Sequence, residues 1–237
     1  LRKKMAINNY SLLSLIFFAL ALLVKSVPDI DVVSLQILNT LMFNEVFFSY
    51  FTELGNGLIC LAIIIPVLSL LSFKTKLNNV KIQTLVMVGL LIGLIVKTLK
   101  ELASFSVRPG FYKFEDIDYL EPIFSYSSFP SGHAATILGI SLVWISLATK
   151  NINTKYSLIV VSILLALALS VSISRIIIGA HWLSDVLGSI AIAFLMLNVV
   201  ELKVMQRILF TSNLSKYISF SLIGMAWLYI ISQGTVY

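Results

Sequence analysis

The chain has 237 residues, of which 59% are hydrophobic and 12% are charged, and its formal net charge is +6. Soluble domains average about 45–50% apolar and about 25% charged residues, so this composition argues against a soluble globular enzyme, a disordered chain and a nucleic-acid-binding protein. A polytopic helical membrane protein remains, and at about 20 residues per crossing the length allows six or seven helices with short loops.

Seven apolar runs, separated by charged or turn residues, predict the membrane helices. They cover residues 11–24, 57–73, 82–99, 134–149, 156–174, 182–200 and 217–232. Segment 31–54 mixes apolar residues with Asn39, Asn44 and Glu45, which predicts one or two amphipathic helices at the interface rather than a crossing. We therefore expect an all-α polytopic membrane protein with a six-helix transmembrane bundle and short interfacial helices. Segment 217–232 is either a seventh helix or lies along the membrane, and residues 1–237 form a single integral-membrane domain.

The charges predict the orientation of this bundle. Three basic residues precede the first apolar run as in a signal peptide, but residues 25–28 lack a small-x-small cleavage site, which favours an uncleaved anchor. With the N-terminus in the cytoplasm, ten of the 11 acidic residues fall outside and 11 of the 17 basic residues fall inside. The inside residues are Arg2, Lys3, Lys4, Lys74, Lys76, Lys81, Lys150, Lys155, Lys203, Arg207 and Lys216. This bias satisfies the positive-inside rule in every cytoplasmic segment.

Polar residues that could carry chemistry gather in three segments, 100–109, 130–133 and 174–185. The 40 residues that join the second and third segments suffice for one helix down, a short turn and one helix up, so both segments share a face. The 20 mostly polar residues that join the first and second segments contain no crossing. Both histidines of the chain, His133 and His181, are therefore expected at one non-cytoplasmic face.

The residue types in these segments point to anion handling. Lys100, Arg108 and Arg175 supply fixed positive charges, and an arginine fork matches phosphate oxygens. Ser131 and Gly132 stand where a helix is predicted to begin, so free backbone N–H groups could hold a phosphate and the glycine lets the backbone approach it.

The two histidines suggest phosphoryl transfer. His181 and Asp185 are four residues apart and are expected on one face of a helix, where the carboxylate would fix the imidazole tautomer and leave the other nitrogen as a nucleophile. His133 could then protonate the departing oxygen. The outer loops show no metal-binding cluster in the sequence, so we expect no metal and no cofactor.

These motifs resemble those of the type 2 phosphatidic acid phosphatase family, over about residues 31–197. The family pattern is K-x6-R-P, then P-S-G-H, then S-R-x5-H-x3-D. The second and third parts match at residues 130–133 and 174–185, whereas the first has one residue too many between Lys100 and Arg108. Glu101 therefore occupies the family's lysine position, and Lys97 is a second candidate for the lysine.

The resemblance implies a fold and a mechanism. It implies a six-helix protein with its site at the outer membrane surface. His181 would attack phosphorus to form a phosphohistidine, with Asp185 orienting it, and His133 would protonate the leaving group. The phosphoryl oxygens would be held by Lys100, Arg108, Ser131, Gly132 and Arg175.

The expected function is a lipid phosphatase in a bacterial cytoplasmic membrane, with its site on the periplasmic side. The compact chain and short outer loop favour lipid A 1-phosphate, and undecaprenyl pyrophosphate and phosphatidylglycerophosphate are the alternatives. A non-catalytic lipid transporter or binding protein is the alternative of another class, which Lys97 inside a helix would support. We expect a phospholipid or glycolipid phosphate as partner within the bilayer, and neither nucleic acid nor an obligate protein partner.

Overall fold

A computed structural model describes residues 9–74, 77–78, 80–150, 155–207 and 212–233. Within these ranges the chain is helical and contains no strand. The helices are α1 (Asn9–Ser26), α2 (Pro28–Asn39), α3 (Glu45–Glu53), α4 (Gly57–Ile59), the π-helical turn η1 (Cys60–Ile64), α5 (Ile65–Lys74), α6 (Ile82–Leu102), α7 (Pro109–Tyr112), α8 (Gly132–Ala148), α9 (Lys155–Ile177), α10 (Leu183–Glu201), α11 (Lys203–Met205) and α12 (Asn213–Gln233). The all-α prediction is confirmed.

Among the residues that the structure describes, five helices are long and apolar enough to cross a membrane: α1, α6, α9, α10 and α12. A sixth candidate is a bent pair in which α3 and residues 57–72 meet at 56°, and α8 is a shorter apolar helix. Each of the seven apolar runs of the sequence is thus helical. The chain is a multi-pass membrane protein, and α12, which contains the predicted segment 217–232, is one of its candidate crossings.

The interfacial segment is the part of the fold that differs most from its prediction. It forms two helices, α2 and α3, which begin at Pro28 and after Asn44. Pro28 stands at the first helical position, where its missing N–H costs nothing, and the Asn44 side chain caps α3 by accepting from the Phe47 amide at 2.8 Å. Because α3 continues into α4 through a bend, part of this segment belongs to a candidate crossing instead of lying wholly at the interface.

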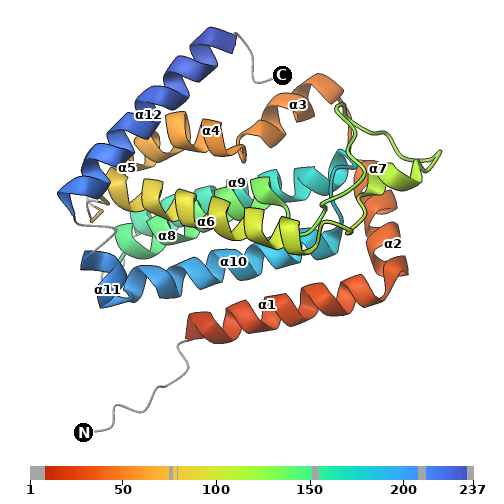
Figure 1. The fold of residues 1–237 in the computed structure, drawn as a ribbon, viewed down its shortest axis with the longest axis horizontal. Helices are drawn as coiled ribbons and strands as arrows, with labels where there is room; N and C mark the ends of the chain where they lie inside the picture. Colours follow the sequence, from red (N-terminus) through yellow and green to blue (C-terminus); the bar gives the residue numbers. More distant parts are fainter. Residues whose placement is uncertain (1–8, 75–76, 79, 151–154, 208–211, 234–237) are drawn as a thin grey trace, which may run out of the picture.

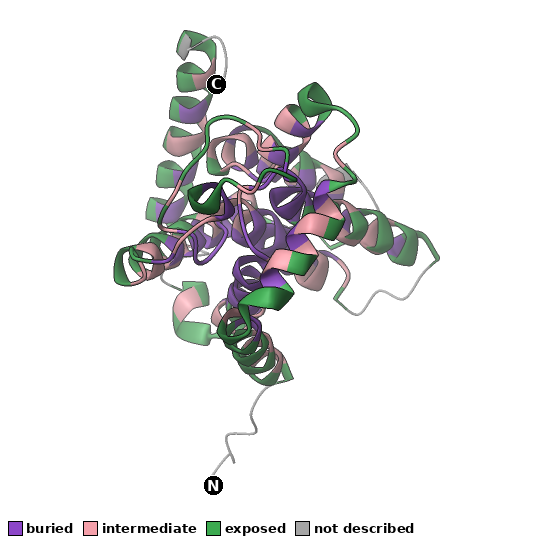
Figure 2. Cartoon of the chain, turned by 90° about the vertical axis from the view of Figure 1, so that its right-hand side faces the viewer, coloured by how far each residue is buried: buried purple, intermediate pink, exposed green. Residues whose placement is uncertain are grey.

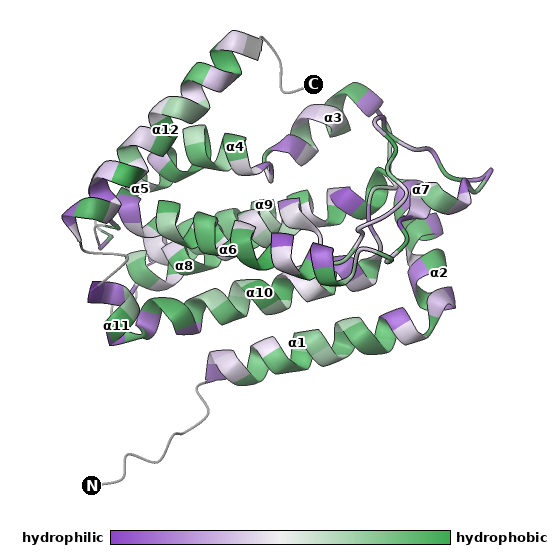
Figure 3. Ribbon diagram, viewed as in Figure 1, coloured by the Kyte–Doolittle hydropathy of each residue, from purple (hydrophilic) through white to green (hydrophobic). Residues whose placement is uncertain are grey.

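The buried centre of the bundle is formed mainly by α6, α8, α9 and α10. In Figure 2 the buried residues, purple, gather in the middle of the molecule. Trp144 on α8 is fully buried, and its indole donates to the Leu68 carbonyl at 2.7 Å, which satisfies its one polar atom. Many exposed residues of the helices are large and apolar, as expected where helices face lipid. The ribbons of the long helices are accordingly mostly green in Figure 3.

One end of the bundle carries the non-helical segment 113–131, which joins α7 to α8. Figure 1 shows α7 and α2 at this end, together with the last turns of α1, α6 and α9 and the start of α10. We call it the site end.

Several predicted inner charges, Arg2, Lys3, Lys4 and Lys76, lie outside the described residues.

Candidate active site

The structure brings the three polar segments together at the site end. The Ser131 amide donates to the Asp185 carbonyl at 3.3 Å, which joins the second segment to the third. Arg108 of the first segment donates through Nη1 to the Ala180 carbonyl at 3.3 Å. The charge of Arg175 acts on both imidazoles, His133 and His181. Residues more than 70 positions apart therefore build one polar centre.

His181 and Asp185 form the buried pair at this centre. Nδ1 of His181 lies 3.2 Å from Oδ2 of Asp185, and the two side chains are 2% and 0% exposed. The expectation that both lie on one helix was wrong, because α10 begins only at Leu183 and His181 stands in the turn before it. The pair forms because Asp185, in the first turn of α10, reaches back to the residues that enter the helix.

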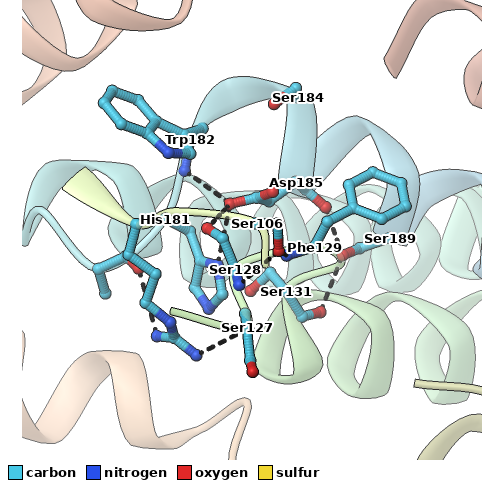
Figure 4. A network of polar contacts seen from close by, with 12 residues as sticks. Ser106, Ser127, Ser128, Phe129, Ser131, His181, Trp182, Ser184, Asp185 and Ser189 are labelled. Atoms are coloured by element: carbon cyan, nitrogen blue, oxygen red, sulfur yellow. Dashed lines mark hydrogen bonds and ion pairs between the residues drawn. The ribbon is translucent and has the colours of Figure 1, made fainter. Parts of the chain in front are cut away.

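The Asp185 carboxylate has partners from three segments: α1, the loop before α8 and the turn that begins α10. Figure 4 shows the last two of these around the carboxylate. Oδ2 accepts from the Trp182 amide at 3.0 Å, in a capping box, and from the Ser128 hydroxyl, in addition to facing His181. Oδ1 faces Nζ of Lys25, on α1, at 3.4 Å. A carboxylate held this firmly fixes the tautomer of His181, with Nδ1 protonated and Nε2 free to react.

Burial sets the protonation state of His181. Its complete burial lowers its pKa well below the ordinary 6.5, the charges of Arg108 and Arg175 lower it further, and the contact with Asp185 opposes them. The ring is therefore neutral at physiological pH, the state that a nucleophile needs.

Lys100 and Arg108 meet at a single backbone carbonyl. Nζ of Lys100 donates to Ser127 O at 2.8 Å and Nη2 of Arg108 donates to the same oxygen at 3.4 Å. Ser127 adopts a left-handed conformation with φ of 54°, and the two cations hold its carbonyl there. Burial lowers the pKa of the Arg108 guanidinium, and the charge of Asp185 opposes this.

The structure also separates the two lysine candidates. Lys97 is 75% exposed and faces Glu101 at 3.9 Å, as its spacing predicts, whereas Lys100 turns to the site. Lys97, Lys100 and Glu101 all lie on helix α6, which ends at Leu102, and the non-helical residues 103–108 lead from it to Arg108. Of the two lysines, only Lys100 shares a hydrogen-bond acceptor with Arg108 of the first motif.

Ser131 stands at the start of α8 with an unused hydroxyl. It is the N-cap residue, yet its side chain makes no capping bond. Among the described residues its Oγ is buried without a hydrogen-bond partner. A Cβ on Gly132 would meet only Val96, at an ordinary 3.6 Å, so this glycine is not required for packing. The free hydroxyl and helix N-terminus fit an anionic ligand.

His133 lies on the wall of a cavity of about 110 Å³ that Arg108, Arg175 and Glu53 also line. Nε2 of His133 is 3.2 Å from Oε1 of Glu53, at the end of α3. Arg175 donates from Nη1 to Thr52 Oγ1 at 2.8 Å, so α3 supports both the arginine and the histidine. Gly55 lies two residues after Glu53, and a Cβ there would be 2.8 Å from the His133 carbonyl oxygen, so the missing side chain lets this bend approach α8 closely.

Sequence reasoning missed Lys25, Thr52, Glu53 and Ser128. Lys25 and Glu53 are charged residues near the ends of apolar or amphipathic segments, which is their only signal in the sequence. No cluster of three or more His, Cys, Asp or Glu side chains suited to a metal occurs in the part of the chain that the structure describes.

Comparison with known proteins identifies the family. A sequence model of the PAP2 superfamily matches residues 81–209, more than half of the chain. No curated protein matches. Among solved structures, LpxE of Aquifex aeolicus is 24% identical with a TM-score of 0.55, covering 72% of this chain and 93% of that one.

A second solved structure is the transmembrane PAP2-type phosphatidylglycerolphosphate phosphatase of Bacillus subtilis. It is 25% identical with a TM-score of 0.57, covering 83% of this chain and 95% of that one. Both neighbours show the fold that the apolar runs predict. On the match over residues 81–209, the chain belongs to the PAP2 superfamily and is a phosphatase of that family.

Proposed function

We propose that the protein removes a phosphate from a membrane lipid, without a metal, through a phosphohistidine on His181. The observation that carries this proposal is the buried contact of His181 Nδ1 with Asp185 at 3.2 Å. It leaves Nε2 as the reactive nitrogen of a neutral imidazole. The family match and two phosphatase neighbours support the reaction class.

The reaction proceeds in two balanced steps. Nε2 of His181 attacks phosphorus and the bond from phosphorus to the lipid oxygen breaks, while His133 gives its proton to that oxygen. Water then attacks the phosphohistidine, His133 takes a proton from the water, and the bond to Nε2 breaks to release phosphate. Asp185 balances the positive charge that His181 carries while it is phosphorylated.

Three cations and one helix terminus would hold the phosphoryl oxygens. They are Lys100, Arg108, Arg175 and the start of α8 at Ser131 and Gly132. Phosphate monoesters hydrolyse extremely slowly in water, so preorganised positive charge of this kind is the main source of catalysis that we assign to the site. The same charges repel a divalent metal ion, which supports a metal-independent reaction.

We place the site on the periplasmic side of a bacterial cytoplasmic membrane, with the N-terminus in the cytoplasm. The distribution of basic residues supports this orientation, since the sequence places Lys81, Lys150, Lys155 and Lys203 at the other end of the helices. Substrate would reach the site laterally from the outer leaflet.

For the substrate we propose lipid A 1-phosphate, because the chain is compact and the segment between α7 and α8 is short. The Bacillus subtilis neighbour favours phosphatidylglycerophosphate as the second candidate, since that enzyme covers the larger share of this chain.

The test is phosphate release by the purified protein from vesicles that contain lipid A 1-phosphate, phosphatidylglycerophosphate or undecaprenyl pyrophosphate, each with EDTA. We expect release from lipid A 1-phosphate that EDTA does not reduce and that His181→Ala abolishes. Faster release from another lipid would replace the headgroup assignment. Binding of these lipids without any phosphate release would instead support a transporter or binding protein.

A further inference from the structure

The N-terminal helices α1 and α2 lie outside residues 81–209, which match the family model, yet both contact the start of α10 at the site. Lys25, in the last turn of α1, places Nζ 3.4 Å from Oδ1 of Asp185, 160 positions further along the chain. The Lys25 side chain is 34% exposed, whereas that of Asp185 is fully buried. An ammonium at the edge of the site thus touches the residue that orients His181.

Helix packing fixes the position of Lys25. α1 lies along α10 (Figure 1), the Ser14 hydroxyl donates to the Ala191 carbonyl at 2.9 Å, and the rings of Phe17 and Phe194 stack at 5.6 Å. Ala21, one turn before Lys25, is fully buried. The lysine therefore reaches Asp185 from an anchored helix end.

Helix α2 contacts Ser184, the residue before Asp185. Asp31 on α2 accepts from the Ser184 amide at 2.9 Å and from the Ser184 hydroxyl at 2.6 Å. Two consecutive residues in the first turn of α10, Ser184 and Asp185, are therefore held by charged side chains from α2 and α1.

The two oxygens of Asp185 have separate partners. Oδ2 faces His181 and accepts from Ser128 and Trp182, while Oδ1 faces Lys25. The Lys25 ammonium also lies 5.5 Å above the ring of Phe129, in the loop that leads to Ser131. Lys25 thereby connects the carboxylate with the loop that begins α8.

We propose that Lys25 is a positioning residue of the phosphatase site, which holds the Asp185 carboxylate in the orientation that presents His181 Nε2 to phosphorus. This inference rests on the function proposed above. Without Lys25 the buried carboxylate keeps its partners on Oδ2 alone and, among the described residues, has none of its own on Oδ1, so the tautomer and direction of His181 are fixed less firmly. Because Lys25 acts through Asp185, its loss lowers kcat and leaves KM nearly unchanged.

The experiment compares Lys25→Met, which keeps the length of the side chain without its charge, with Lys25→Arg. Each is made in the wild-type and in the Asp185→Asn background, and kcat and KM are measured with radiolabelled lipid phosphate. Ser14→Ala is the matched control, because it weakens the contact of α1 with α10 and keeps the lysine. Thermal unfolding in detergent reports the stability of every variant.

In the wild-type background, Lys25→Met should lower kcat on the order of tenfold, the size of one lost charge-assisted bond, while Lys25→Arg and Ser14→Ala keep most of it. In the Asp185→Asn background Lys25→Met should lower kcat no further, because the carboxylate through which Lys25 acts is already absent. An unchanged kcat in Lys25→Met, or an equal further loss in Asp185→Asn, overturns the proposal. A wild-type protein that releases no phosphate contradicts the proposed function instead.

Discussion

The two imidazoles of the site, those of His181 and His133, differ in burial and in the number of their polar partners. The His181 side chain is 2% exposed and fixed by a carboxylate that has donors from α1, from the loop before α8 and from the start of α10. The His133 side chain is 26% exposed, faces a cavity and contacts the single carboxylate of Glu53. This contrast supports the roles that we propose, because a nucleophile needs a fixed direction and a neutral ring, whereas a general acid needs access to the leaving group and to water.

The largest predicted effect comes from replacing His181, the buried histidine of this comparison. His181→Ala removes the nucleophile, so no phosphoenzyme forms, and kcat should fall by about 10⁴-fold or more, as when a covalent nucleophile is removed from other hydrolases. Steady-state phosphate release measures it. Turnover at the wild-type rate would show that another group attacks phosphorus.

Replacing His133 should have a smaller effect that depends on the leaving group. A general acid contributes typically about 10²–10⁴-fold, so His133→Ala should lose about this factor with an alkyl phosphate such as a lipid. With p-nitrophenyl phosphate, whose leaving group departs without a proton, the loss of the phosphorylation rate should be far smaller. Single-turnover kinetics with both substrates measure the difference. An equal loss with both would argue against proton donation by His133.

Replacing Glu53 tests the surroundings of His133, the more exposed histidine of this comparison. Glu53→Gln removes the negative charge 3.2 Å from His133 and leaves this histidine among the charges of Arg175 and Lys100, so it holds its proton less well. We expect kcat for a lipid phosphate to fall on the order of tenfold, the worth of one charged contact. Glu101→Gln is the control, since Glu101 is 68% exposed and faces Lys97. A loss as large in the control would mean that only the overall charge matters.

The smallest effect concerns pH. Burial and two arginines lower the pKa of His181 well below 6.5, so its neutral, reactive form persists as the pH falls through 6.5. The acid limb of kcat/KM should therefore lie below pH 6.5, once the ionisation of the substrate phosphate is taken into account. An acid limb at 6.5 in a profile of kcat/KM against pH would mean that His181 is solvated like a histidine on the surface.

The sequence predicts most of the fold, because lipid requires long apolar helices and these are visible as runs. It predicts the three polar segments equally well, since their residues are close together within each motif. It does not predict Lys25 or Glu53, whose partners lie 160 and 80 positions away and follow only from how α1 and α3 pack. It also misplaced His181 on a helix, because four-residue spacing arises both within a helix and in a capping box at its start.

Trapping the phosphoryl group tests the central claim most directly. His133→Ala, which should slow hydrolysis of the intermediate, is mixed with labelled p-nitrophenyl phosphate and quenched in alkali, where phosphohistidine survives. The account predicts label that is stable in alkali, released by acid and confined to the peptide that contains His181. Label on a different residue, or continued turnover with no labelled protein at any time, would contradict it.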